Sequence, residues 1–320
     1  MDSMPPELVE RLKKEHYYLV GRHSAVKLCR WLINSLIKGQ TCYKQKFYGI
    51  KSHRCLQMTP AVHKCTHACV FCWRVQPADL GVYWDQLSFK ENEFDSPEFI
   101  AEKTIDAQRK LLAGYNPKAH PYTDPIKFKE ALEPKHVAIS LAGEPTIYPK
   151  LGELIENYHQ RGMTTFLVTN GTLPEVIESI TPPSQLYVTI PAPDKETYVQ
   201  AARPLIKDGW ERLLKTISLI PDYKAYTVFR LTLVRNLNFH NPRGYAELIN
   251  KGQPRYVELK SYMALGFSKD RLGIGNMLWH EEIYEFAKKI EMLTDYKIID
   301  ESPPSRVVLL SKQKHAHKFT

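Results

Sequence analysis

The segment Cys65-Thr-His-Ala-Cys69-Val-Phe-Cys72 places three cysteines on one short loop, with the spacing C-x3-C-x2-C. Three thiolates on such a loop can hold three irons of a cubane 4Fe–4S cluster and leave the fourth iron free for a cofactor or substrate. Zinc is the alternative, with His67 as a fourth ligand, but His67 is too close in sequence to the cysteines for easy tetrahedral geometry. The spacing therefore favours an iron–sulfur cluster.

The other three cysteines, Cys29, Cys42 and Cys55, are each 13 residues apart. A disulfide framework is disfavoured, because a chain of this length without a signal peptide is expected in a reducing compartment. Three thiols close to the first loop instead predict a second cluster, again with one iron that lacks a protein ligand. For Cys29 the alternative is core packing, because it falls in the amphipathic helical pattern of residues 26–37.

The composition is that of an ordinary globular protein, since 43% of the 320 residues are hydrophobic and 25% are charged. It excludes disordered, collagen-like and coiled-coil classes. No uncharged apolar run approaches the roughly 20 residues that span a bilayer. The N-terminal sequence MDSMPPELVE is acidic where a signal peptide would be basic and then apolar. We therefore expect a monomeric cytoplasmic protein with no membrane association.

The net charge of +9 is concentrated in the first quarter of the chain. Residues 1–74 carry 13 Lys and Arg against four Asp and Glu, and the remaining residues are balanced. Such asymmetry indicates a polyanionic partner, most often a nucleic acid. A solvated basic face is the alternative.

Buried β-branched runs alternate with helical patterns after the cysteine loop. We predict helices near residues 150–160 and 175–180, and strands at 136–141, 164–169, 185–190, 227–234 and 255–260. Strands alternating with helices imply a parallel sheet with right-handed crossovers. The pattern predicts an α/β fold, a partial (β/α)6 barrel whose site lies at the carboxyl ends of its strands.

Three segments are expected from this pattern. Residues 1–55 would form a basic N-terminal helical extension that carries the second-cluster cysteines. Residues 56–265 would form the barrel, with an insertion at 76–134 that covers the barrel mouth or contacts RNA. Residues 266–320 would form a C-terminal extension.

With Phe71 before the third cysteine, the loop reads C-x3-C-x-aromatic-C and resembles that of radical S-adenosylmethionine (SAM) enzymes. The G-G-E motif frequent in that superfamily corresponds to Ala142-Gly143-Glu144 here, so only the Gly-Glu pair is kept. The resemblance implies SAM-binding roles for Ser140, Gly143, Glu144, Thr169, Asn170, Arg230 and Thr232. The alternative is that the two glycine loops only form turns and that Thr169 and Asn170 only cap a helix.

A narrower resemblance covers nearly the whole chain, and is to the radical SAM enzymes of the wybutosine pathway, the 4-demethylwyosine synthases. It rests on both cysteine triplets and on residues 72–74, 107–114, 138–145, 164–171, 258–263 and 276–280. It implies a lyase that condenses pyruvate with 1-methylguanosine in the anticodon loop of tRNA-Phe to form 4-demethylwyosine. Two 4Fe–4S clusters and SAM would be its cofactors. The stand-alone archaeal type, without a flavodoxin domain, would need an external one-electron donor of flavodoxin or ferredoxin type.

The resemblance implies two ways of activating pyruvate. A lysine could form a Schiff base with the keto carbon, and Lys44 matches the family's position, with Lys46 as the fallback. Otherwise, the open iron of the second cluster could chelate pyruvate. Either lysine could instead contact tRNA phosphate.

Two other functions stay open on the sequence. One is a radical SAM enzyme that modifies a protein or peptide and uses its second cluster as an electron relay. The other is a non-catalytic RNA-binding module stabilised by metal.

Overall fold

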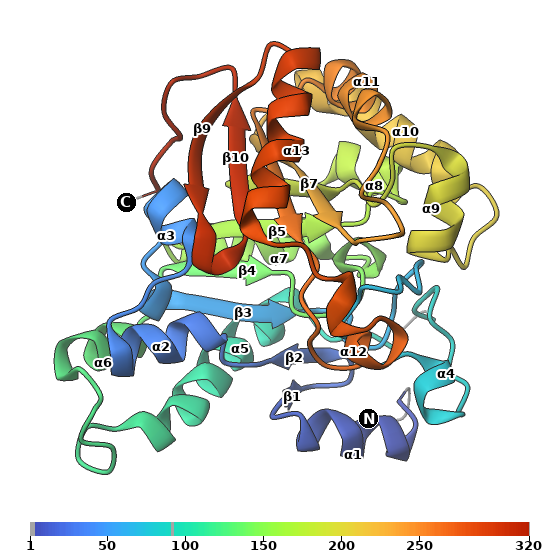
Figure 1. The fold of residues 1–320 in the computed structure, drawn as a ribbon. Helices are drawn as coiled ribbons and strands as arrows, with labels where there is room; N and C mark the ends of the chain where they lie inside the picture. Colours follow the sequence, from blue (N-terminus) through green and yellow to red (C-terminus); the bar gives the residue numbers. More distant parts are fainter. Residues whose placement is uncertain (1–3, 91–92, 320) are drawn as a thin grey trace.

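A single ten-stranded sheet organises the computed structural model, which describes residues 4–90 and 93–319 (Figure 1). The strand order is β1-β2-β3-β4-β5-β6-β7-β8-β10-β9. The expected extensions and insertion also included residues 1–3, 91–92 and 320, which lie outside the described residues.

Six adjacent strands in the middle of the sheet are parallel and in sequence order. They are β3 (Cys55–Thr59), β4 (His136–Ile139), β5 (Thr164–Thr169), β6 (Gln185–Thr189), β7 (Tyr226–Leu233) and β8 (Tyr256–Ser261). The predicted α/β fold with a partial (β/α)6 barrel is therefore confirmed. The strand β3 begins at Cys55, so the expected boundary between residues 55 and 56 falls inside it.

Antiparallel strands extend both edges of the parallel sheet. On one side are β1 (Tyr18–Val20) and β2 (Ser24–Val26). The N-terminal extension was predicted to be helical, but it also contains these two strands. On the other side β10 (Val307–Ser311) pairs with β8, and β9 (Lys297–Ser302) pairs with β10. Both extensions thus join the sheet.

The helices that follow strands β4 to β8 and the C-terminal helix continue the predicted alternation. They are α7 (Leu151–Gln160), α8 (Pro174–Ser179), α9 (Lys195–Ala202), α10 (Gly209–Leu219), α11 (Pro242–Gly252) and α13 (His280–Leu293). The other helices are α1 (Pro6–Lys14), α2 (Arg30–Lys38), α3 (Tyr43–Tyr48), α4 (Pro77–Leu80), α6 (Pro125–Ala131) and α12 (Ser268–Arg271). Turns of 3-10 helix occur at Ser52–Arg54, Ala113–Tyr115, Pro145–Ile147, Ile220–Asp222, Ile274–Asn276 and Pro303–Ser305.

The main helix of the insertion predicted at residues 76–134 lies behind the sheet. This helix, α5 (Pro97–Leu112), packs against β1, β2, β3 and α7 through buried residues such as Ile100 and Ala107. Two parallel strands require a crossover between them, usually a helix. The helix α5 is that crossover between β3 and β4, and so belongs to the barrel itself.

The two faces of the sheet are packed differently, because side chains alternate along each strand. On the outer face Leu167, Val188 and Leu231 pack with the crossover helices. On the inner face a second cluster joins the strands to α3 and β10, and consists of Tyr43, Phe47, Tyr48, Ile50, Phe166, Tyr187, Val228, Tyr256, Val307, Leu309 and Phe319. The short helix α3, which carries Lys44, is therefore held against the inside of the barrel.

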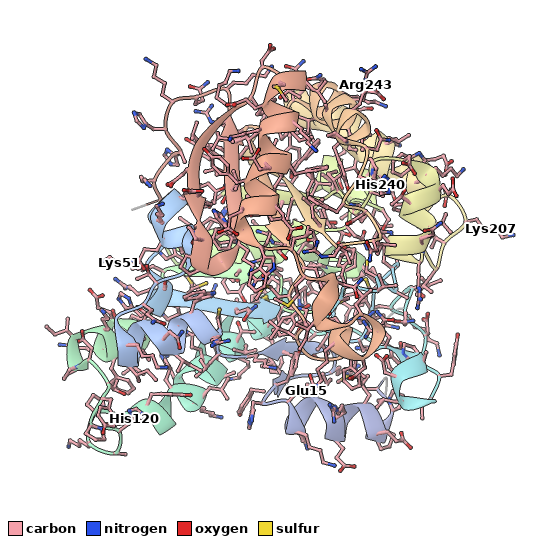
Figure 2. All side chains as sticks on the ribbon, viewed as in Figure 1. Glu15, Lys51, His120, Lys207, His240 and Arg243 are labelled. Carbon is pink, nitrogen blue, oxygen red and sulfur yellow. The ribbon has the colours of Figure 1, made fainter. Side chains whose placement is uncertain are left out.

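The surface carries most of the charged side chains (Figure 2). Lys51, from the basic first quarter, lies on the opposite side of the molecule from Lys207. Among the described residues, no helix combines the length and apolarity needed to cross a lipid bilayer.

Candidate active site

The three cysteines of the first loop lie together after the carboxyl end of β3. Burial raises the pKa of the Cys69 thiol well above its usual range, and the neighbouring Cys72 and Cys65 raise it further. Burial also raises the pKa of Cys65 to about 11. Closeness in sequence does not by itself bring three side chains together. The conformation of the folded loop groups the side chains of Cys65, Cys69 and Cys72.

The second triplet, Cys29, Cys42 and Cys55, also converges, although its members come from three separate elements. Cys29 immediately precedes α2, Cys42 immediately precedes α3, and Cys55 begins β3. Burial raises the pKa of Cys42 to about 11 and that of Cys55 to about 12, and the charge of Cys29 adds to both shifts. The helical position expected for Cys29 is wrong, because its backbone is extended and α2 begins one residue later.

Both cysteine triplets lie at the interior of the barrel. Leu56 and Met58 point to the outer core, so the alternate positions Cys55 and Gln57 face inward. The first loop follows the other end of β3, which spans about 13 Å over its five residues. The triplets therefore lie at the two ends of one strand, with the barrel interior between them.

The two candidate lysines are separated by the fold. The Lys44 ammonium lies 4.2 Å from the ring centroid of Tyr187 and 5.6 Å from that of Phe166, on the inner face of the sheet. Lys46 instead pairs with Asp300 at 2.7 Å and donates to the Glu301 carbonyl at 2.6 Å, and its side chain is 54% exposed. Only Lys44 reaches the interior.

The environment of Lys44 increases the share of its amine that is neutral. Burial and the charge of Arg230 lower the pKa of Lys44 to about 8, against the opposing charges of Glu258, Cys42 and Cys55. A neutral lysine amine is nucleophilic toward a keto carbon.

A fully buried carboxylate, Glu258 on β8, ties α3 to the barrel. Its Oε2 accepts a hydrogen bond from the Tyr43 hydroxyl at 3.0 Å, and its Oε1 accepts one from Tyr48 at 2.9 Å. Arg230 forms an ion pair with it at 3.0 Å and also donates to the Tyr43 hydroxyl at 2.9 Å. Tyr43 and Tyr48 are both on α3 and flank Lys44, so this network fixes the helix that carries it.

Arg230, which the resemblance implied as a SAM contact, is engaged by other side chains. Its guanidinium pairs with Glu258 and stacks 4.4 Å from the Tyr187 ring centroid, near Lys44. Thr232 lies one inward position further along β7, opposite Lys260 of β8. Of these two candidates, Thr232 is the one nearer the carboxyl ends of the strands.

The loops after β4 and β5 bring the other SAM candidates together. Ser140 follows β4, and its backbone amide donates to the Met58 carbonyl of β3 at 3.0 Å. Gly143 has a φ of +71°, and a Cβ there would lie 1.8 Å from the Ala61 carbonyl oxygen. Only glycine allows this loop to pack so closely against the segment that leads into the cysteine loop.

Glu144 is buried and its carboxylate is already engaged. It accepts from the Thr146 amide and hydroxyl, from the Thr169 hydroxyl at 2.7 Å and from the Asn170 amide at 2.7 Å. It thereby links the ends of β4 and β5. Asn170 in turn lies beside the first loop, with its side-chain amide 2.8 Å from the Thr66 hydroxyl and 3.8 Å from the Cys65 sulfur.

The donor sets fit iron–sulfur clusters chemically. All six cysteines are free thiols, and thiolates are the soft ligands that such clusters use. Within the described ranges, no group of three or more His, Cys, Asp or Glu side chains is arranged to hold a single metal ion. Near the first loop, Arg74 keeps two buried guanidinium nitrogens without a hydrogen-bond partner, a site that an anionic group would compensate.

Sequence reasoning missed three residues that support the site: Glu258, Lys260 and Arg271. Glu258 and Lys260 are charged residues inside an otherwise buried strand, and that contrast was a usable signal. Arg271 of α12 donates to the carbonyls of Cys72 at 2.6 Å and Arg74 at 2.8 Å, and pairs with Asp79 at 2.8 Å. Nothing in its local sequence indicated this contact with the cysteine loop.

Comparisons with known proteins agree with this geometry. The radical SAM superfamily model matches residues 59–249, and the model described as wyosine base formation matches residues 251–312. The fold and the matched region define a radical SAM enzyme, which implies SAM and a 4Fe–4S cluster.

The relatives narrow the family. The chain is 53% identical over 315 residues to the SAM-dependent tRNA 4-demethylwyosine synthase of Pyrococcus abyssi, covering 97% of this chain and 90% of that protein. It is 43% identical over 310 residues to the enzyme of the same name from Methanocaldococcus jannaschii, covering 97% of each. A solved structure of TYW1 with a lysine-pyruvate adduct bound matches with a TM-score of 0.87 and 40% identity, over 99% of this chain and 98% of that one. The chain belongs to the tRNA 4-demethylwyosine synthase family of the wybutosine pathway.

Removing the buried carboxylate should destabilise the fold strongly. We expect Glu258→Ala to lower the free energy of unfolding in urea by about 3–5 kcal/mol, because Arg230 is left as an uncompensated buried charge. Glu285→Ala is the matched control on an exposed surface, where Glu285 is 64% exposed and pairs with Lys288, and should cost less than about 0.5 kcal/mol. Equal losses in the two variants would contradict the role given to Glu258.

Proposed function

We propose that this chain forms 4-demethylwyosine by condensing pyruvate with the 1-methylguanosine in the anticodon loop of tRNA-Phe, as a carbon–carbon lyase. The main support is that an inward-facing lysine, Lys44, lies beside the inward-facing triplet Cys29, Cys42 and Cys55 in a radical SAM barrel. A single interior thus offers a place for both reactants close to the SAM loops.

Cys65, Cys69 and Cys72 would hold the SAM cluster, and SAM would lie against Ser140, Gly143, Thr169, Asn170 and Thr232. Bound there, the cluster and SAM supply the 5′-deoxyadenosyl radical that takes a hydrogen atom from the N-methyl group of the base. Glu144 acts on this site through its neighbours, because its hydrogen bonds to Thr169 and Asn170 position their loop. The enclosed interior restricts water and keeps reactive carbon centres near their intended partner.

Lys44 would activate pyruvate. Its amine attacks the keto carbon and water leaves, giving a Schiff base that makes the adjoining bonds of pyruvate easier to break. A relative that is 40% identical has been solved with a lysine-pyruvate adduct, which supports this route. Lys46 is the weaker candidate because its ammonium pairs with Asp300 at the surface.

A second 4Fe–4S cluster at Cys29, Cys42 and Cys55 would hold the carboxylate of the same pyruvate molecule at its open iron. Schiff-base formation and binding of the carboxylate at this iron are then compatible, because the first uses the keto carbon of pyruvate and the second its carboxylate. Lys260 lies near this triplet: burial and then the charge of Arg230 lower its pKa, and the charges of Cys42, Glu258 and Cys29 oppose this shift. Its ammonium adds positive charge where an anionic substrate would bind.

The remaining partners follow from the same proposal. The basic residues 1–74 would contribute phosphate contacts to tRNA, which makes binding sensitive to salt. An external flavodoxin or ferredoxin would donate electrons to a monomeric enzyme in the cytoplasm. The extensions at 1–55 and 266–320 would act with the barrel as parts of one catalytic unit.

The reaction is tested with anaerobically reconstituted enzyme, SAM, isotope-labelled pyruvate and methylated tRNA, read by nucleoside mass spectrometry. The wild-type chain should form the labelled tricyclic base. Cys69→Ala should abolish SAM cleavage, whereas Cys42→Ala should retain some uncoupled cleavage without forming the base. Normal product from Cys42→Ala would contradict the pyruvate-activating role of the second triplet, and SAM cleavage without any tRNA product in the wild type would favour a protein substrate.

Lys44 and Lys46 form a natural pair of test and control. Incubation with pyruvate and cyanoborohydride should add one reduced pyruvate to residue 44 in the wild type and in Lys46→Ala. The Lys44→Ala variant should carry no adduct at residue 44, as read by peptide mass spectrometry. The expected difference arises because, of these two lysines, Lys44 is the one whose amine lies inside the barrel, where burial lowers its pKa. A stable adduct on Lys46 in the wild type would overturn the assignment.

A further inference from the structure

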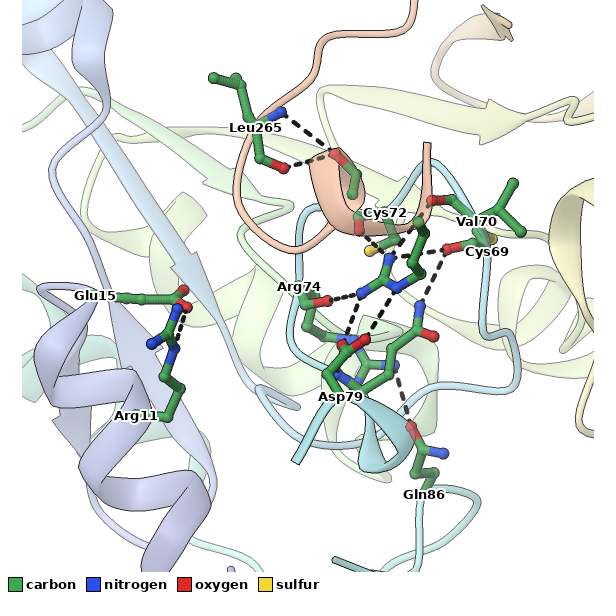
Figure 3. A network of polar contacts seen from close by, with 12 residues as sticks. Arg11, Glu15, Cys69, Val70, Cys72, Arg74, Asp79, Gln86 and Leu265 are labelled. Atoms are coloured by element: carbon green, nitrogen blue, oxygen red, sulfur yellow. Dashed lines mark hydrogen bonds and ion pairs between the residues drawn. The ribbon is translucent and has the colours of Figure 1, made fainter. Parts of the chain in front are cut away.

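Arg74, two residues after the last cysteine of the first loop, is almost completely buried, with 1% of its surface exposed. One guanidinium nitrogen, Nη2, donates to the Gln86 side-chain oxygen at 3.1 Å (Figure 3). The other two, Nε and Nη1, have no hydrogen-bond partner in the part of the chain that the structure describes. Arginine stays charged in proteins, so this is a buried and incompletely paired cation.

No carboxylate neutralises Arg74 among residues 4–90 and 93–319. The nearby carboxylates are used elsewhere: Asp79 pairs with Arg271 at 2.8 Å, and Asp85 pairs with Lys64 at 3.3 Å. The other groups near it are neutral or positive, since His63 is buried with a pKa lowered to about 3 by burial first and then by the charges of Lys64, His23 and Arg74. A charge buried in this way is costly unless an anion compensates it.

Gln86 links Arg74 to the cysteine loop, because its side-chain oxygen accepts from Arg74 and its main-chain carbonyl accepts from the Cys65 amide at 2.8 Å. Although burial raises the pKa of Cys65 and Cys69, the charge of Arg74 acts in the opposite direction on both. Figure 3 shows Arg74 on the same loop as Cys72 and Cys69, with its side chain directed toward Gln86. A cluster held by these three thiolates is therefore the anion that this cation faces.

We propose that Arg74 is the buried counter-charge of the SAM cluster and raises its reduction potential. This inference rests on the proposed binding of that cluster by Cys65, Cys69 and Cys72, but not on pyruvate or tRNA. Reduction adds one negative charge to the cluster, and a nearby cation stabilises the reduced form more than the oxidised form. Arg74 is thus a positioning residue that acts through the cluster, and it makes the one-electron step that precedes SAM cleavage easier.

Arg271 provides a contrast within the same loop. It also lies against the loop, but its guanidinium is paired with Asp79, and it donates to main-chain carbonyls of residues 72 and 74. Its charge is already balanced, so its main effect is on the geometry of the loop. Comparing the two arginines separates charge from packing.

The test is a redox titration of the reconstituted full chain, followed by electron paramagnetic resonance, using the cluster signal that changes when SAM is added. Arg74→Met should lower the reduced-to-oxidised ratio at a fixed potential about tenfold, which is a negative shift of about 59 mV for one electron. Arg74→Lys keeps the charge and should stay within about threefold of the wild type. Arg271→Lys, the control, keeps the charge beside Asp79 but loses main-chain contacts to the loop, and should change the ratio much less than Arg74→Met.

Each result bears on the inference. A wild-type ratio in Arg74→Met with full iron and sulfide content would overturn it, as would an equal shift in Arg271→Lys, which would indicate packing. If Arg74→Met cannot retain the cluster, retention by Arg74→Lys supports the charge role and loss from both variants refutes it. A wild-type chain without any SAM-sensitive signal would instead overturn the proposed cluster assignment, and the inference with it.

Discussion

The buried carboxylate of Glu258 is the interaction on which the arrangement of the barrel interior depends. It joins the strand β8 to α3 through the hydroxyls of Tyr43 and Tyr48, which are more than 200 residues away in the sequence. The helix α3 has six residues and could not hold a fixed position by itself. Because Cys42 and Lys44 belong to this segment, their places opposite the SAM loops are consequences of that carboxylate.

Charge is distributed differently at the two ends of the interior. At the α3 end, Arg230 and Glu258 neutralise each other, and Lys44 and Lys260 remain as cations near three thiols. At the loop end, Arg271 and Asp79 neutralise each other, and Arg74 remains. Each thiol triplet thus has a nearby positive charge that no carboxylate of residues 4–90 or 93–319 pairs, as expected where the protein holds anionic groups.

Much of this organisation could be predicted from the sequence, because it depends on local pattern. Apolar β-branched runs predicted the strands β4 to β8, and the cysteine positions predicted both groups of thiols. Other features depend on contacts that pattern does not contain. The helical pattern of residues 97–112 did not indicate that α5 packs behind β3. Alternation along β7 indicated which face of the sheet carries Arg230, but not that Glu258 would be its ion-pair partner. Lys44 and Lys46 are two residues apart on a helix, so they point to different sides, but only the fold shows which side is the interior.

The central claim is that both cysteine triplets bind iron–sulfur clusters facing one barrel interior. It is tested most directly by crystallography of the anaerobically reconstituted protein with anomalous scattering at the iron edge. The account predicts two iron peaks, one at Cys65, Cys69 and Cys72 and one at Cys29, Cys42 and Cys55, with the Lys44 side chain between the second peak and the SAM loops. Iron at the first triplet alone, with the second triplet free or holding a single zinc ion, would contradict it.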